Sequence, residues 1–262
     1  MHHVSLDLGS YGIVLAVRND VDNRDTSLQT STDAMFLSNV VVKELGSFFT
    51  AQNAESKVKK HAKNCFVSAT HIVPTEVTEE SSPKPLHLPF TSFLMGNVSQ
   101  INDGLVFSVN VNSVCKNLTQ TELLLPLVEH IILELNHCIN SPFDISSLVL
   151  PQSLPVQHQN VLLDTFHNLD YPDITVVPTL EALVASYLFK AHAPSKLETV
   201  VIVDVGQLLT KAVVFLHQRF DINIIHSEEW WMGAVQVDQA LYEYCLTKID
   251  EEIRATMNEN PR

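Results

Sequence analysis

The chain has 262 residues, of which 45% are hydrophobic and 18% charged. This composition is typical of a globular protein with a buried core in one large domain or two moderate ones. The 30 acidic residues outnumber the 16 basic ones and give a net charge of -14, which repels a nucleic-acid backbone, so we expect no nucleic-acid partner. No apolar run reaches the roughly 20 residues that a membrane-spanning helix needs, so we expect no membrane partner.

The cysteines and the start of the sequence bear on the compartment. Four cysteines are scattered along the chain without a C-x-x-C pair, so we expect free thiols rather than a disulfide framework. The opening Met1-His2-His3 is not a charged segment followed by an apolar one, which favours a cytoplasmic protein. For a processed chain, the lumen of the endoplasmic reticulum is the alternative, and only there would the sequons at Asn97 and Asn117 have a role.

Residues 4–17 predict a strand, a tight turn and a second strand. Asp7 lies between apolar neighbours just before Gly9, and glycine lets backbone N–H groups approach a ligand closely. This pattern is typical of a hairpin that faces a phosphate group. Residues 200–215 repeat it, with Asp204 and Gly206 in the places of Asp7 and Gly9. The two copies predict two related lobes that face one another.

A small subdomain is expected next in the chain. Residues 35–42 predict a strand, and residues 51–64 predict a helix whose lysines form an exposed face rather than a binding patch. Residues 75–89, rich in proline and charge, predict a surface loop. Residues 91–95 and 105–111 then predict two neighbouring strands. We expect residues 36–115 together to form a small α+β insertion.

A long helix is expected from about Thr119, which has the spacing of a capping box with Glu122. Pro126 should kink this helix. Its apolar positions predict a buried stripe of Leu123, Leu124, Leu127, Val128, Ile131, Leu135 and Cys138. On the same helix His130, Glu134 and His137 have the spacing of zinc ligands, but no second Cys/His cluster supplies a fourth ligand. We therefore expect an exposed polar face and no zinc.

The rest of the chain alternates strands and helices. Residues 148–150 and 174–177 predict strands, and residues 155–169 and 179–190 predict helices, so parallel pairing through crossover connections is expected. After the second hairpin, residues 221–226 predict a third strand and residues 235–254 a long helix. We expect residues 1–35 and 116–195 to form the core of lobe one, and residues 196–262 the first part of lobe two.

This order of parts resembles the ATPase domain of the seventy-kilodalton heat-shock chaperones, in the actin-like ATPase superfamily, over almost the whole chain. Asp7-Leu8-Gly9-Ser10 resembles the first phosphate loop, in the form found in the larger, exchange-factor-like relatives of the cytosol or the lumen of the endoplasmic reticulum. Asp204-Val205-Gly206 resembles the second loop. Further matches in the same order lie at residues 148–151, 178–183, 232–234 and 259–262. The resemblance implies an α/β fold of ribonuclease-H-like lobes, with lobe one complete and lobe two partial.

The same resemblance implies a cofactor and a site. The cofactor would be ATP or ADP with magnesium. Asp7 and Asp204 would hold the magnesium through water and would be the catalytic residues of an active enzyme. The residues implied in binding the cofactor are Asp7, Gly9, Ser10, Asp204, Gly206 and Gly233.

Departures from the family pattern argue against efficient ATP hydrolysis. The family's second loop is D-L-G-G-G-T, whereas here bulky Gln207, Leu208 and Leu209 follow Gly206. The family's catalytic lysine aligns near Glu55, with Lys57 two positions away, and Val177 stands in place of a glutamate. Phosphoryl transfer depends on positive charge and a bound metal to neutralise the developing anion. We therefore expect weak or no hydrolysis.

The part of lobe two that closes the adenosine pocket in the family has no counterpart in this sequence. An uncovered apolar sheet face costs about 25 cal/mol per Å2, so we expect a missing protein partner or a dimer through lobe two. Trp230 and Trp231 would suit such an interface or the core equally well.

Three functions remain open from the sequence. The first is a divergent chaperone-type ATPase domain that acts through protein contacts in protein folding and the stress response, as a co-chaperone or exchange-factor-like subunit. The second is a non-enzymatic structural subunit of a larger assembly. The third is a working ATPase in which Lys57 or Lys43 replaces the missing lysine.

Overall fold

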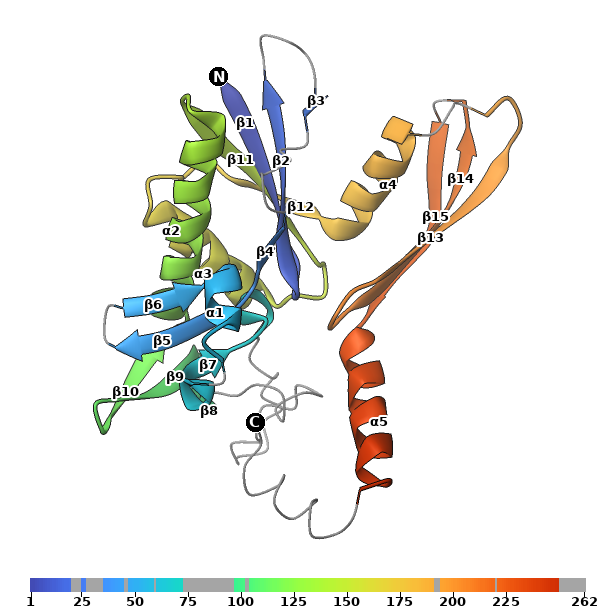
Figure 1. Ribbon diagram of the computed structural model, residues 1–262. Helices are drawn as coiled ribbons and strands as arrows, with labels where there is room; N and C mark the ends of the chain where they lie inside the picture. The colour runs from blue at the N-terminus through green and yellow to red at the C-terminus, as the bar shows by residue number, and fades with distance from the viewer. Residues whose placement is uncertain are drawn as a thin grey trace.

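The chain forms a mixed α/β structure built on several separate sheets (Figure 1). The computed structural model describes residues 1–19, 25–26, 35–44, 47–58, 60–72, 97–101, 104–190, 194–219 and 221–249. The predicted loop at 75–89, the strand at 91–95 and the match at 259–262 lie outside these residues. No helix in the described ranges is both long and apolar enough to cross a membrane.

The largest sheet contains the first hairpin and two parallel strands. Its order is β12-β11-β1-β2-β3, and β4 also pairs with β2. The strands are β1 (His2–Leu8), β2 (Gly12–Asn19), β3 (Asp25–Thr26), β4 (Met35–Leu37), β11 (Phe143–Leu150) and β12 (Thr175–Pro178). β1 and β2 are antiparallel, with Asp7 opposite Val14, whereas β11 runs parallel to β1 and β12 parallel to β11. The predicted hairpin and parallel pairing are confirmed.

Alternation along β1 explains how this sheet is buried. Val4, Leu6 and Leu8 lie on one face and are fully or almost fully buried. They pack in one cluster with side chains of α2 (Gln120–Ile139) and α3 (Val156–His167), among them Leu127 and Phe166. At about 25 cal/mol per Å2 of apolar surface, burial in this cluster stabilises the packing of the large sheet against the two helices.

The predicted start of α2 is confirmed. Thr119 Oγ1 accepts a hydrogen bond from the Glu122 N–H at 3.2 Å, and Glu122 Oε2 accepts one from the Thr119 N–H at 2.7 Å. The buried stripe is as predicted except at Cys138, which is exposed. Pro126 lies inside the helix, which continues through it to Ile139. His130 packs edge-on against the ring of Phe36, with 6.0 Å between ring centroids.

The predicted strand at 35–42 is divided between two sheets. β4 pairs with β2, and β5 (Val40–Glu44) lies in a separate sheet of order β6-β5-β7 with β6 (Ser47–Thr50) and β7 (Cys65–Phe66). Ser38 lies at the break, where its N–H donates to the Tyr11 carbonyl at 3.0 Å and its carbonyl accepts from the Ala69 N–H at 2.7 Å. These contacts between distant segments turn the chain from one sheet to the other.

The predicted helix at 51–64 is also wrong in length. α1 covers only Ala51–Glu55, and turns and the short 3-10 helix η1 (Ala62–Asn64) follow. The side chain of buried Asn64 donates to the Asn110 carbonyl at 2.7 Å and accepts from the Asn110 N–H at 2.9 Å. This pair ties the segment to a third sheet, made of β8 (Asn97–Ile101), β9 (Gly104–Val111) and β10 (Val114–Thr119).

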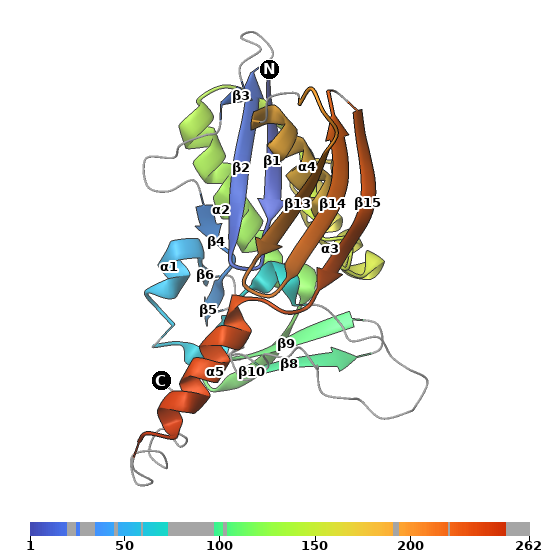
Figure 2. The same ribbon diagram turned by 90° about the vertical axis from the view of Figure 1, so that its right-hand side faces the viewer.

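Lobe two is an antiparallel sheet of order β13-β14-β15, covered on one face by α4 (Thr179–Lys190). Its strands are β13 (Glu198–Val205), β14 (Thr210–Gln218) and β15 (Asp221–Trp230). Leu180 and Val184 of α4 pack against Val213 and Phe215 of β14. In Figures 1 and 2, α4 lies between this sheet and lobe one.

Several apolar side chains of lobe two are exposed to solvent. The valines at 201, 203 and 205 are exposed on the far face of β13. α5 (Ala234–Leu246) projects from the end of the sheet (Figure 1), and among its residues only Val235 is buried. The predicted strand at 221–226 extends to Trp230, whereas the predicted helix at 235–254 ends at Leu246. Trp231 packs against Leu208 and Val235, and Trp230 is exposed.

A buried network of polar groups joins residues 70–72 to α2 and α3. His158 Nε2 lies 2.7 Å from the Thr70 carbonyl, which can only accept, so Nε2 carries the proton. The other ring nitrogen then accepts from Gln120 Nε2 at 2.8 Å, and the same amide donates to the Ile72 carbonyl at 2.7 Å. The network is therefore satisfied only with neutral His158.

These buried histidines should make the protein sensitive to acid. Burial lowers the pKa of His158 to about 4, and burial with the nearby His158 and Lys211 lowers the pKa of His71 to about 3. The unfolded chain binds these protons near pH 6.5, so stability present above that pH is lost as the pH falls toward 4. We expect the free energy of unfolding to fall by about 2 kcal/mol per histidine between about pH 7 and 5.

Urea unfolding at the two pH values measures this loss. His158→Gln keeps one donor and one acceptor without titrating, so its loss should be smaller than that of the unchanged protein by the share of one histidine. An equal pH dependence in both proteins would contradict this account.

Candidate functional site

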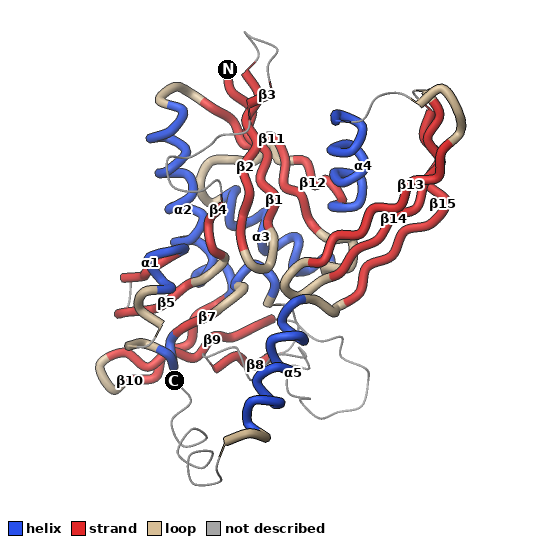
Figure 3. Tube along the Cα trace, turned by 45° about the vertical axis from the view of Figure 1, so that its right-hand side comes forward, coloured by secondary structure: helices blue, strands red, loops and turns tan. Residues whose placement is uncertain are grey.

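The turns of the two predicted hairpins meet (Figure 3). The Leu208 N–H in the turn between β13 and β14 donates to Ser10 Oγ in the turn between β1 and β2 at 3.3 Å. Next to it, Ser68 Oγ donates to Gln207 Oε1 at 2.9 Å. The lobes also contact where the Ser153 N–H donates to Glu229 Oε2 at 2.8 Å. Ser10 is almost fully buried in this contact.

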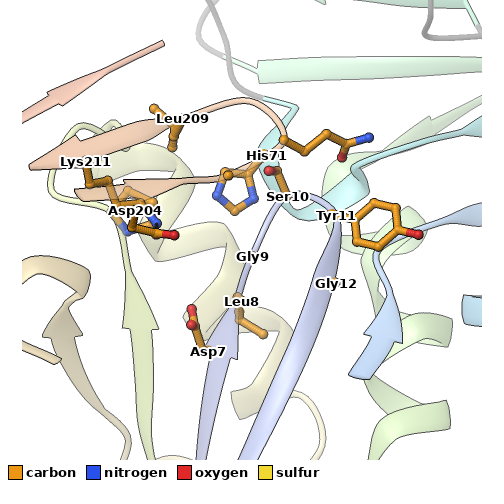
Figure 4. A pocket seen from close by; sticks show the side chains of 13 residues that line it. Asp7, Leu8, Gly9, Ser10, Tyr11, Gly12, His71, Asp204, Leu209 and Lys211 are labelled. Atoms are coloured by element: carbon orange, nitrogen blue, oxygen red, sulfur yellow. Dashed lines mark hydrogen bonds and ion pairs between the residues drawn. The ribbon is translucent and has the colours of Figure 1, made fainter. Parts of the chain in front are cut away.

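A cavity of about 250 Å3 lies between the two turns (Figure 4). Asp7 reaches it from the end of β1 and Asp204 from β13. Five of the six residues predicted to bind a cofactor line this cavity: Asp7, Gly9, Ser10, Asp204 and Gly206. His71 and Lys211 also line it, and the sequence prediction did not include them.

The sixth predicted residue, Gly233, has a structural role outside the cavity lining. It precedes α5, whose Ala234 N–H donates to the Gly206 carbonyl at 2.9 Å and whose Val235 N–H donates to the Gln207 carbonyl at 3.1 Å. A Cβ atom on Gly233 would collide with those two carbonyl oxygens. Glycine therefore lets α5 dock directly on the second turn.

Lys211 governs the charge of the cavity. Its Nζ lies 3.2 Å from Asp204 Oδ2, and its side chain is only 11% exposed. Burial raises the pKa of Asp7, the ammonium of Lys211 opposes this rise, and the carboxylate of Asp204 adds to it. The cavity thus holds two carboxylates and one ammonium, with the ammonium bonded to one of the acids.

The second turn does not present a free set of amides to a phosphate group. Its Gly206 N–H donates to the Leu209 carbonyl at 2.8 Å, and its Leu208 N–H donates to Ser10. A phosphate-binding turn needs such N–H groups to point at the anion. Gln207 and Leu209 line the cavity as predicted, but Leu208 is buried against Trp231 and Val235 instead.

The lysines proposed to replace the family's catalytic lysine lie elsewhere. Lys57 stacks over the ring of Phe49, 5.6 Å from its centroid, and Lys43 lies beside Glu44 at 4.0 Å. Neither side chain lines the cavity, and Glu55 is exposed on α1. Lys211 could have been found from the sequence, because a hairpin that pairs Val205 with Thr210 also pairs Asp204 with Lys211.

His71 carries no sequence signal, because its position depends on contacts between distant segments. It lies in the 3-10 helix η2 (Ala69–His71), where the Thr70 hydroxyl donates to the Gly9 carbonyl at 3.0 Å. That hydroxyl also lies 3.0 Å from His71 Nδ1. The first turn and the His71 segment are therefore held together.

No family model and no curated protein matches this chain. Within the described ranges, no group of three or more His, Cys, Asp or Glu side chains is arranged to hold a metal ion. Asp7 and Asp204 face the same cavity, but Lys211 already binds Asp204, and the Gly206 and Leu208 amides of the second turn are engaged. In this arrangement Lys211 and these two amides are bound to other groups of the chain, so they are not free to bind the phosphates of a nucleotide.

Replacing Lys211 tests its effect on the buried acid. In Lys211→Met the hydrocarbon stem is largely kept and the positive charge is removed, so the pKa of Asp7 should rise further. A carbon NMR titration of the Asp7 carboxyl group measures this change. Lys248→Met is the matched control, since Lys248 lies over the Tyr244 ring outside the cavity. An unchanged Asp7 titration in Lys211→Met would contradict the assigned charge balance.

Proposed function

We propose that this chain is a divergent ATPase domain of the actin-like superfamily that acts through protein contacts, without ATP hydrolysis. The internal repeat supports the fold. β1–β2 and β13–β14 are both antiparallel hairpins with an aspartate near the end of the first strand. In each lobe a further strand pairs antiparallel with the second one, β4 with β2 and β15 with β14. The resemblance to the seventy-kilodalton heat-shock ATPase domain remains the source of the family assignment.

The main support for the proposed loss of catalysis is the direct contact between the two turns. Hydrolysis of a nucleotide depends on amides, a metal and cationic groups aimed at the phosphates. Here the Leu208 amide donates a hydrogen bond to Ser10, and Lys211 forms an ion pair with Asp204. The same groups would have to exchange partners before they could bind a phosphate.

The exposed apolar residues of lobe two support a role in binding other proteins. We propose a co-chaperone or exchange-factor-like function in protein folding, with a chaperone or a client as partner. A structural subunit of a larger assembly is the second candidate, because the same surfaces would suit it. An active ATPase is disfavoured by the positions of Lys57 and Lys43 outside the cavity lining.

We propose a cytoplasmic location, with the lumen of the endoplasmic reticulum as the alternative for a processed chain. Cys115, Cys138 and Cys245 are free and exposed. Exposed free thiols suit a reducing compartment.

Calorimetric titration with Mg-ATP, combined with a phosphate-release assay, tests the loss of catalysis. We expect no phosphate release and no binding in the micromolar range, because the turns bind each other. Micromolar binding together with turnover would overturn the proposal. Any turnover would then be checked with Asp204→Asn, which should abolish activity at this cavity and leave that of a contaminant unchanged.

Affinity capture of the native protein separates the two leading functions. Recovery of a full-length chaperone supports the co-chaperone role. A stable particle of several other subunits supports the structural role and contradicts the first candidate.

A further inference from the structure

We propose that two copies of this chain associate by pairing their β13 strands edge to edge in an antiparallel register centred on Ile202. This inference is independent of whether the cavity binds a nucleotide. It assigns a site and a geometry to self-association through lobe two.

The two edges of the lobe-two sheet differ in how they meet solvent. β15 has a register shift opposite Val214 and Phe215, and it carries Asp221, Glu228 and Glu229. A bulge and charged side chains are the usual means by which an edge strand avoids further pairing. β15 is therefore protected.

β13 has less of this protection, because it has no bulge and its two acids, Glu198 and Asp204, lie near its ends, with Asp204 bound to Lys211. It pairs with β14 over its full length without a register shift, and its sequence ETVVIVDV contains no proline or lysine. Its outer face presents Val201, Val203 and Val205, each about 60% exposed. Among the described strands it pairs only with β14. A long regular edge with exposed β-branched residues is a template for another strand.

In lobe one, the strand equivalent to β13 pairs with a neighbour on both of its edges. β1 has the place of β13 in the internal repeat, and its second edge pairs with β11. That pairing makes β1 a central strand of its sheet, with Val4 and Leu6 fully buried. β13 lacks the corresponding neighbour within the described residues.

Charge restricts the register in which a second copy can pair. With Ile202 opposite itself, Val201 lies opposite Val203, and Asp204 lies opposite Val200 of the second copy. Shifting the centre to Val201 would place Glu198 directly opposite Asp204, which like-charge repulsion disfavours. The register centred on Ile202 therefore pairs β-branched residues over most of the strand and keeps the acids apart.

The same register brings Glu198 close to the start of α5 of the second copy. Glu198 lies opposite Gly206, whose carbonyl accepts from the first N–H of α5 at 2.9 Å. The first turn of α5 contains no acidic residue, and a helix N-terminus favours a nearby negative charge. In Figure 2, α5 extends below the sheet from this end of β13. Exposed Leu197 of one copy would lie beside α5 of the other.

Sedimentation velocity over a range of protein concentrations tests this dimer, with Val203→Asp as the variant and Ile225→Asp as the matched control. The two residues are 58% and 56% exposed, so both variants add one acid at a solvent-facing position, in the regular part of β13 for Val203 and at the register shift of β15 for Ile225. Val203→Asp should raise the dissociation constant at least about ten-fold, and Ile225→Asp should change it much less. Circular dichroism of both variants confirms that they remain folded.

Two further measurements sharpen the test. Amide hydrogen exchange in β13 should slow as the protein concentration rises, whereas exchange in β15 should not. Each copy carries a net charge of -14, so salt should tighten the dimer by screening the repulsion. A monomer at every concentration up to about 0.1 mM would overturn the proposal, because a specific interface binds more tightly than that. Equal weakening by the two substitutions would also overturn it.

Discussion

The hydrogen bond from the Leu208 amide to Ser10 Oγ holds the two halves of the fold together at the candidate site. It joins the turns of two hairpins that are about two hundred residues apart in the chain, and it lies beside the contact between Ser68 and Gln207. Because both turns border the same cavity, the bond also determines which groups remain free there. A turn that donates its amide to a serine does not offer that amide to a phosphate.

The charged groups of the cavity are also bound to one another within the chain. Burying a carboxylate is costly unless another group compensates its charge. Lys211 supplies that compensation from within the hairpin that carries Asp204, since the two residues face each other across β13 and β14. The cavity therefore combines two acids with an internal cation that is bound to one of them.

The sequence predicted those parts of the structure that depend on local patterns. The apolar residues around Asp7, the capping box at Thr119 and the repeated Asp-x-Gly turns all indicated the correct elements. The division between β4 and β5 was missed because tertiary bonds of Ser38 turn the chain there. The helix predicted at 51–64 was too long because Asn64 binds a distant strand, and helix propensity does not report such a contact. In the site, the acids were predicted, whereas His71 depends on packing that no motif records.

In the function that we propose, the two turns bind each other in place of a nucleotide. Amide hydrogen exchange of Leu208, measured with and without Mg-ATP, tests it most directly. A bond to Ser10 predicts slow exchange in the protein alone and no change on adding the nucleotide. Fast exchange in the protein alone, with protection appearing only when Mg-ATP is added, would contradict the account.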